Sequence, residues 1–286
     1  MTDPLHLLTF WQNEAVRTAL WIGAVAALLN AVVGVFTVLR HHGFAGHALG
    51  DSSSAGGSLS IFLGIGSLWG FLGMAWIAAL VMGWLGLGRA QSRDLSTGVV
   101  LGATLGVSAL FLYFDVTVTQ YSGATVDVMF GSLFAVAPKL LLPIFLTVFL
   151  AIALVLIFYR QLLLIAADPQ LAQASGVPVR RLELLYLLLL GTAAALSALS
   201  IGVILATALL LGPAAAALRL ARRPWQCFLY AFLIALGSVW LGIYLAFASY
   251  YYNQGTSWPV SFFVVVLLLL AYLTSLYWRP RPVRSS

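Results

Sequence analysis

Charged residues are scarce in this chain. They make up 8% of its 286 residues, against 62% hydrophobic residues, whereas a soluble domain carries roughly 25% charged residues. This scarcity excludes an ordinary water-soluble domain and predicts an integral membrane protein. The apolar runs are continuous and lack the alternation of β-barrel strands, so the spans are expected to be helices.

Cysteine and lysine each occur once. Cys227 alone cannot form a disulfide framework or a thiolate cluster within the chain. Lys139 has no glycine-rich phosphate-binding pattern around it, so the chain cannot be a P-loop ATPase by itself. HExxH, GxSxG and CxxC motifs are also absent, which gives an intramembrane hydrolase little support. The function classes that remain are a pore, a secondary transporter, and the membrane subunit of a pump whose ATPase is a separate chain.

Apolar stretches long enough to cross a bilayer recur along the whole chain. They cover about residues 18–39, 46–65, 66–87, 95–113, 140–159, 182–199, 201–220, 225–248 and 260–278. The lead over residues 1–17 lacks the features of a cleavable signal, so the first span is expected to be retained. We therefore predict an all-α polytopic membrane protein of about nine helices, forming a single domain over residues 1–286.

The basic residues indicate which way the chain crosses the membrane. If the N-terminus lies outside, 12 of the 14 basic residues fall on the inner side, as the positive-inside rule requires. Residues 1–17 are then an extracytoplasmic lead, 160–181 a cytoplasmic loop and 279–286 a cytoplasmic tail. Because the basic residues occur in short clusters between apolar spans, the net charge of +6 does not indicate nucleic-acid binding.

The hydrophilic segment 160–181 contains the signals of a short helix. Asp168 can cap the helix with Pro169 at its first position, and Gly176 stops it after two turns. A helix over about Pro169–Ser175, outside the membrane, is predicted. It is either an ordinary loop helix or a contact for a partner.

The second span carries two ionisable side chains. His47 and Asp51 are four residues apart and so share one face of a helix. Ionisable residues at bilayer depth are expensive and usually line a pathway or a site. We interpret this span as the substrate-handling helix of a transporter. The alternative is a cytoplasmic loop that ends in a polar helix cap.

Other polar residues allow two interpretations. Ser52 and Ser54 can add hydroxyl oxygens to the path, or the serines and glycines of this span can serve close helix packing. The span is accordingly expected to be irregular or closely packed. The connection over residues 114–139 carries Asp115 and Asp127, which are expected at the outer face of the protein.

Six short stretches occur in an order and spacing known from one protein family. They are Gly46–Gly56 after Val38–Arg40, Ser96–Val100, Phe130–Leu133, Asp168–Val177, Ser200–Leu205 and Leu211–Ala216. Together they resemble the permease subunits of bacterial zinc, manganese and iron ABC importers, the ABC-3 family. The resemblance extends over roughly Leu20 to Leu276.

The resemblance implies a type II-like ABC importer permease in the bacterial plasma membrane. Two copies would form a translocation path at their interface. Cytoplasmic ATPase subunits would dock below, and an extracytoplasmic solute-binding protein would deliver the substrate. That substrate would be a divalent metal ion (Zn²⁺, Mn²⁺ or Fe²⁺), with no permanently bound cofactor.

The family pattern also implies residue roles. Its aspartate and histidine fall on His47 and Asp51 with the two types exchanged, and its proline falls on Ala55. The pair still offers one nitrogen and one oxygen ligand, which suits all three metals. The residues of the implied coupling helix, seated on the ATPase, are Asp168, Pro169, Ala172 and Gly176.

Three alternatives remain open at the level of the sequence. One is an importer of the same class that carries a metal chelate or another non-metal solute. Another is an ATP-independent secondary carrier, which would be expected to show paired broken helices and internal symmetry; neither is apparent. The third is a membrane scaffold or enzyme that transports nothing.

Overall fold

The computed structural model describes residues 10–86, 90–120, 123–131, 133–134, 136–252 and 258–277. These residues form helices and no strands. Eight of the helices are long and apolar enough to cross a membrane. They are α2 (Glu14–Leu39), α4 (Ser67–Gly86), α5 (Ala90–Thr117), α7 (Leu141–Ile157), α10 (Val179–Ile201), α11 (Val203–Leu220), α12 (Pro224–Tyr252) and α13 (Val260–Tyr277). The predicted all-α polytopic membrane fold is confirmed.

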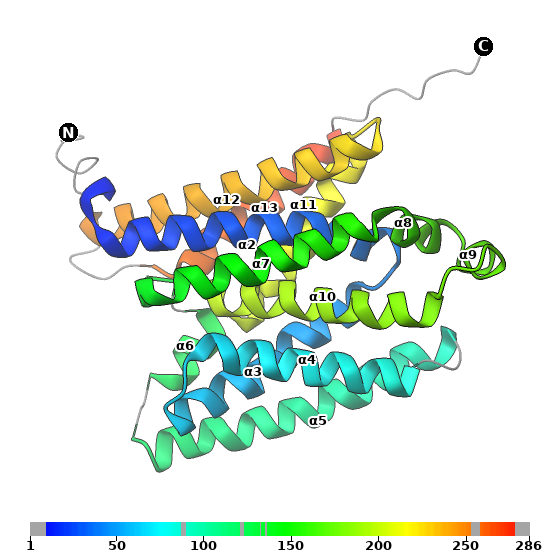
Figure 1. Cartoon of the computed structure of the whole chain (residues 1–286). Coiled ribbons are helices and arrows are strands. Elements are labelled where there is room, and N and C mark those ends of the chain that lie inside the picture. Colours follow the sequence, from blue (N-terminus) through cyan, green and yellow to red (C-terminus); the bar gives the residue numbers. More distant parts are fainter. Residues whose placement is uncertain are drawn as a thin grey trace.

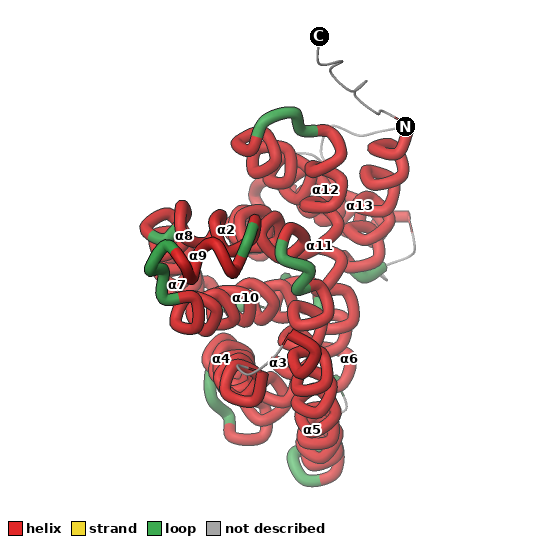
Figure 2. Tube along the Cα trace, turned by 90° about the vertical axis from the view of Figure 1, so that its right-hand side faces the viewer, coloured by secondary structure: helices red, strands yellow, loops and turns green. Residues whose placement is uncertain are grey.

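The long helices run side by side as one bundle (Figure 1). α12 and α13 lie along one side and α5 along the opposite side, with α2, α7 and α10 between them. The end-on view keeps the same order (Figure 2). α2 and α10 are the most buried of the apolar helices, so the centre of the bundle is shielded from lipid by its own outer helices.

The second predicted span corresponds to α3 (Gly43–Leu63), a continuous helix of 21 residues that is not among the eight membrane-crossing candidates. It packs against α4, α5, α10 and α11. Its serine hydroxyls donate to carbonyl oxygens one turn back, as in Ser58 to the Ser54 oxygen at 3.0 Å and Ser60 to the Gly57 oxygen at 2.6 Å. Because these bonds satisfy the hydroxyls inside the helix, a polar segment can be buried among apolar neighbours.

A single glycine separates α10 from α11. Gly202 has φ 87°, and Gly131, which follows α6 (Ala124–Phe130), has φ 78°. A Cβ on Gly131 would lie 2.5 Å from the Gly202 nitrogen. Only glycine combines these backbone conformations with so close an approach, which explains the glycine in the Phe130–Leu133 stretch.

The structure differs from the sequence prediction at two places. α5 extends through Thr117, so Asp115 lies on that helix and is 0% exposed rather than in the connection. The helix continues because Phe111 and Phe114 pack against Phe62 of α3, with ring centroids 6.3 and 5.7 Å away.

The second difference lies in the segment predicted as a hydrophilic loop. Its first part forms α8 (Tyr159–Ala167), and only then does the short helix follow as α9 (Pro169–Ala174). Leu162 and Ile165 are buried, because α8 lays its apolar face against the bundle.

The connections that carry basic residues gather at one end of the bundle. Figure 1 shows the α2–α3 turn, the end of α4, the start of α5, α8, α9 and the α11–α12 turn at the same end. The predicted topology requires this arrangement. Which membrane side this end faces stays a prediction.

The α3–α4 contact depends on glycine at one position. A Cβ on Gly56 would overlap the carbonyl oxygen of Gly70, whereas a Cβ on Gly73 would meet no atom within 4 Å. We expect Gly56→Ala to destabilise the protein by about 1–3 kcal/mol through overpacking. The matched Gly73→Ala should leave stability unchanged. Thermal unfolding of the purified variants in detergent measures both; equal midpoints would contradict the close α3–α4 approach.

Candidate functional site

The ionisable pair of α3 is brought together by the helix, as predicted. His47 Nε2 lies 3.6 Å from Asp51 Oδ2, and the two side chains are 43% and 17% exposed. The pair is therefore half-buried and opens on one side to the surface of the single chain.

Thr207 of α11 orients the imidazole. Its Oγ1 lies 2.9 Å from His47 Nδ1. Because that ring nitrogen is engaged, the other nitrogen is directed at the Asp51 carboxylate. Sequence reasoning missed Thr207, although a signal was available: it is the only polar side chain between Ser200 and Arg219.

The geometry of the pair fits a shared cation. Two tetrahedral ligands of a zinc-sized ion lie roughly 3.4 Å apart when each metal–ligand bond is near 2.1 Å, close to the 3.6 Å between His47 and Asp51. Among the described residues, no group of three or more His, Cys, Asp or Glu side chains is placed to hold a metal. The described part of one chain therefore offers two candidate ligands at this position, His47 and Asp51.

The two serines face a different neighbour. Ser52 Oγ lies 2.7 Å from Thr104 Oγ1, and Ser54 Oγ donates to Ser108 Oγ at 2.9 Å. Both serines are buried against α5. The structure thus brings His47 and Asp51 together but places these hydroxyls in the α3–α5 contact.

The short helix α9 has the predicted caps. Asp168 Oδ1 accepts hydrogen bonds from the backbone N–H of Gln170 at 2.8 Å and of Leu171 at 3.1 Å, with Pro169 at the first helical position. Gly176 follows the helix at φ 78°, a conformation that favours glycine.

The two faces of α9 differ. Ala172 is 0% exposed and packs with Ile165 of α8 and Leu182 of α10. Leu171 on the outer face is 54% exposed. The helix is therefore fixed to the bundle on one side and presents an apolar side chain on the other.

An ion pair joins α10 to the turn between α2 and α3. Arg40 lies 3.5 Å from Glu183, with side chains only 3% and 11% exposed. The guanidinium also stacks 4.3 Å from the centre of the Tyr186 ring, and the Tyr186 hydroxyl lies 2.7 Å from Thr37 Oγ1. α10 begins just after α9, and α3 begins just after Arg40, so this contact connects α9 to the helix that carries His47.

Comparison with known proteins agrees with this architecture. The model of the ABC 3 transport family matches residues 12–278. The chain belongs to this family. It is a multi-pass membrane permease of the ABC-3 type and not itself an enzyme.

Two curated relatives match along nearly their whole length. The high-affinity zinc uptake system membrane protein ZnuB of Haemophilus influenzae is 30% identical over 271 residues, covering 94% of this chain and 99% of the relative. The manganese import system permease protein ScaB of Streptococcus gordonii is 29% identical over 280 residues, covering 97% and 94%.

A solved structure shows the same fold. PsaBC from Streptococcus pneumoniae, determined in complex with a Fab, matches with a TM-score of 0.82 at 22% identity. The match covers 97% of this chain and 96% of that one.

Proposed function

We propose that this ABC-3 permease is the membrane subunit of an ATP-driven importer that moves Zn²⁺, Mn²⁺ or Fe²⁺ into the cytoplasm. The observation that carries the proposal is the His47–Asp51 pair, brought together on α3 and oriented by Thr207. The zinc and manganese systems to which the relatives belong support the choice of cargo.

A second copy of the chain would complete the site. Each chain offers one nitrogen and one oxygen ligand on a partly exposed face. Two copies facing one another would supply four such ligands, the number that Zn²⁺ prefers. A sparse set of this kind binds loosely enough to release the ion, as transport requires.

The energy would come from a separate ATPase. With the N-terminus outside and the C-terminus inside, the end of the bundle that carries α9 faces the cytoplasm. The exposed Leu171 suits a groove on the ATPase, while the buried Ala172 ties the helix to α8 and α10. A solute-binding protein would deliver the ion at the opposite end.

The Arg40–Glu183 ion pair would transmit movement of the ATPase to the helix that carries the proposed ion site. Movement of α9 would displace the start of α10, and Glu183 would carry that displacement to Arg40. Because Arg40 immediately precedes the α2–α3 turn, the displacement would reach His47 on α3 as a rigid-body motion.

The ligand role is tested by three substitutions. His47→Ala and Asp51→Ala each remove a ligand and should reduce uptake of labelled Zn²⁺ and Mn²⁺ to background. Thr207→Val keeps both ligands but frees the imidazole, so uptake should fall about 10–100-fold. Uptake is measured in proteoliposomes that contain the ATPase, with the binding protein outside.

The control for these variants is Thr147→Val, because the Thr147 hydroxyl donates to the Pro143 carbonyl of its own helix, α7. This variant should transport normally, and all four proteins should insert equally. Normal uptake by both His47→Ala and Asp51→Ala would remove the ligand role.

The docking role of α9 is tested at Gly176. Gly176→Trp places a bulky side chain at a φ of 78° beside the proposed ATPase contact, so ATP hydrolysis should no longer drive uptake. Gly66→Trp lies in the exposed α3–α4 turn, a turn at the other end of the bundle (Figure 1), and should leave coupling intact. Copurification of the ATPase and uptake per ATP hydrolysed are the measurements. Wild-type values for Gly176→Trp would contradict docking at α9.

The route through the ion pair is tested by reversing its charges. Arg40→Glu and Glu183→Arg each place two like charges together, so fewer ions should move per ATP hydrolysed. The double variant Arg40→Glu/Glu183→Arg restores the attraction and should recover part of the coupling. If the single variants lower only thermal stability while the ratio of ions to ATP stays constant, the pair is structural and the route is wrong.

A further inference from the structure

The net charge of the chain is concentrated in its C-terminal third. Residues 1–183 contain eight acidic and eight basic side chains and are balanced. Residues 184–286 contain six arginines and no acidic residue, so they account for the whole formal charge of +6. Three of these arginines, Arg219, Arg222 and Arg223, lie at the α11–α12 turn, and the sequence beyond α13 carries the other three.

A groove of about 620 Å³ lies beside this turn, where the end of α11, the start of α12 and the end of α13 meet. Its walls are partly polar and partly apolar. The polar side includes Arg222, Gln226 and Tyr230, and the apolar side Leu220, Leu233 and Ile234. None of the described residues that line it is acidic.

The polar side of the groove offers hydrogen-bond donors. Gln226 Oε1 accepts from the backbone N–H of Arg222 at 2.9 Å and of Arg223 at 3.1 Å. Because the amide oxygen is held in this way, the amide NH₂ group is left to donate. With the guanidinium of Arg222 and the hydroxyl of Tyr230, it forms a donor set that suits a phosphate group.

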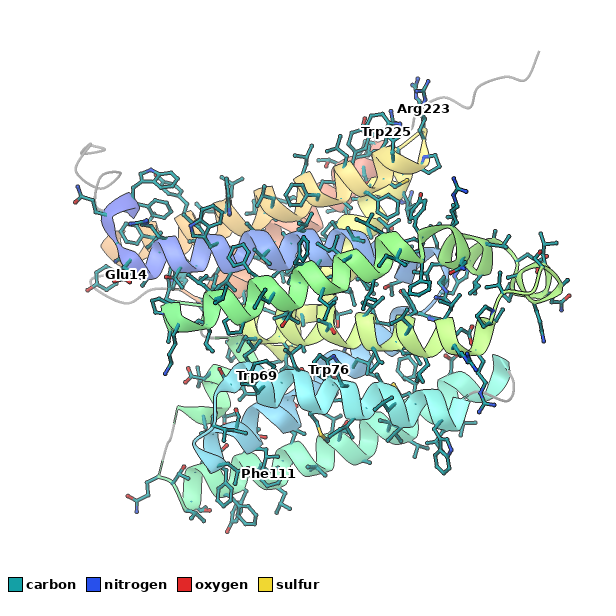
Figure 3. The ribbon with its side chains drawn as sticks, in the orientation of Figure 1. Glu14, Trp69, Trp76, Phe111, Arg223 and Trp225 are labelled. Carbon is teal, nitrogen blue, oxygen red and sulfur yellow. The ribbon has the colours of Figure 1, made fainter. Side chains whose placement is uncertain are left out.

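The groove lies at the level of the membrane surface. Figure 3 shows Arg223 and Trp225 projecting from the start of α12, away from the bundle. Trp225 is 56% exposed, and tryptophan with arginine at a helix end is typical of the lipid headgroup region. Leu233, two helical turns further along α12, is 53% exposed, so the apolar wall runs toward the hydrocarbon.

We propose that this groove binds an anionic phospholipid. The phosphate would lie against Arg222 and Gln226, and an acyl chain would follow Leu233 and Ile234 along α12. Basic pockets between membrane helices are suited to such headgroups. The proposal goes beyond the transport function and does not depend on which ion is carried.

The positive charge of the groove favours an anionic phospholipid over two other possible occupants, a zwitterionic lipid and the C-terminal tail of the chain itself. A zwitterionic lipid fills the same apolar wall but leaves the excess positive charge uncompensated. α13 ends at Tyr277, two residues after Ser275 of the groove, but the charged side chains in the sequence that follows, over residues 278–286, are all arginines. Like charge disfavours its insertion next to Arg222.

The experiment measures lipid retention on the purified chain. Native mass spectrometry of the protein in detergent, titrated with phosphatidylglycerol or phosphatidylcholine, gives the affinity for each lipid. The wild type should retain phosphatidylglycerol preferentially. Arg222→Gln should weaken that affinity about fivefold, the equivalent of one interfacial arginine contact, and Arg222→Lys should retain most of it.

Arg180→Gln is the matched control, because it removes the same charge from an exposed position outside the groove. It should leave phosphatidylglycerol binding unchanged. An equal loss in Arg180→Gln and Arg222→Gln would show attraction to overall charge and overturn the site. Equal retention of both lipids by the wild type would also overturn it. So would loss of selectivity on deleting residues 278–286 while Arg222→Gln binds normally, because the tail would then be the binding element.

Discussion

A polar group buried in a membrane protein needs a partner inside the protein, because lipid offers none. α3 is the helix on which this constraint acts most strongly. Its hydroxyls bond to their own helix or to α5, and its histidine bonds to Thr207 of α11. These needs place α3 among α4, α5, α10 and α11 rather than against lipid. The least buried of the long helices, α5, α7 and α13, form the outside of the bundle.

The same constraint explains why the His47–Asp51 pair differs in exposure from the serines beside it. Ser52 and Ser54 are buried in the contact between α3 and α5, whereas the side chains of His47 and Asp51 are partly exposed. A cation can reach a pair of side chains that is fixed by a hydrogen bond but still partly exposed, and it can leave such a pair again. The serines that follow the pair in the sequence serve the packing that keeps α3 in place.

The buried charges at the α9 end have a different role. A buried ion pair contributes little net stability, because desolvation offsets much of the attraction, but breaking it leaves an unpaired charge. The Arg40–Glu183 pair is therefore better suited to fixing the register between α10 and the α2–α3 turn than to strengthening the fold. Arg219, Arg222 and Arg223 lie apart from it, at the α11–α12 turn, where they are exposed. The candidate ion site, the Arg40–Glu183 contact and the proposed lipid groove thus occupy separate parts of one helical chain.

The sequence by itself determined the helical membrane fold, eight of its nine predicted spans, the caps of α9 and the pairing of His47 with Asp51. Each of these depends on neighbours in the chain: continuous apolar runs, Asp168 before Pro169, and a spacing of four residues. Only the tertiary structure decided that Thr207 orients His47, that Ser52 and Ser54 turn to α5, that Asp115 is buried on α5, and that Glu183 reaches Arg40. Those contacts join residues far apart in the chain. A helix fixes which side chains share a face, but the packing of helices against one another selects what that face meets.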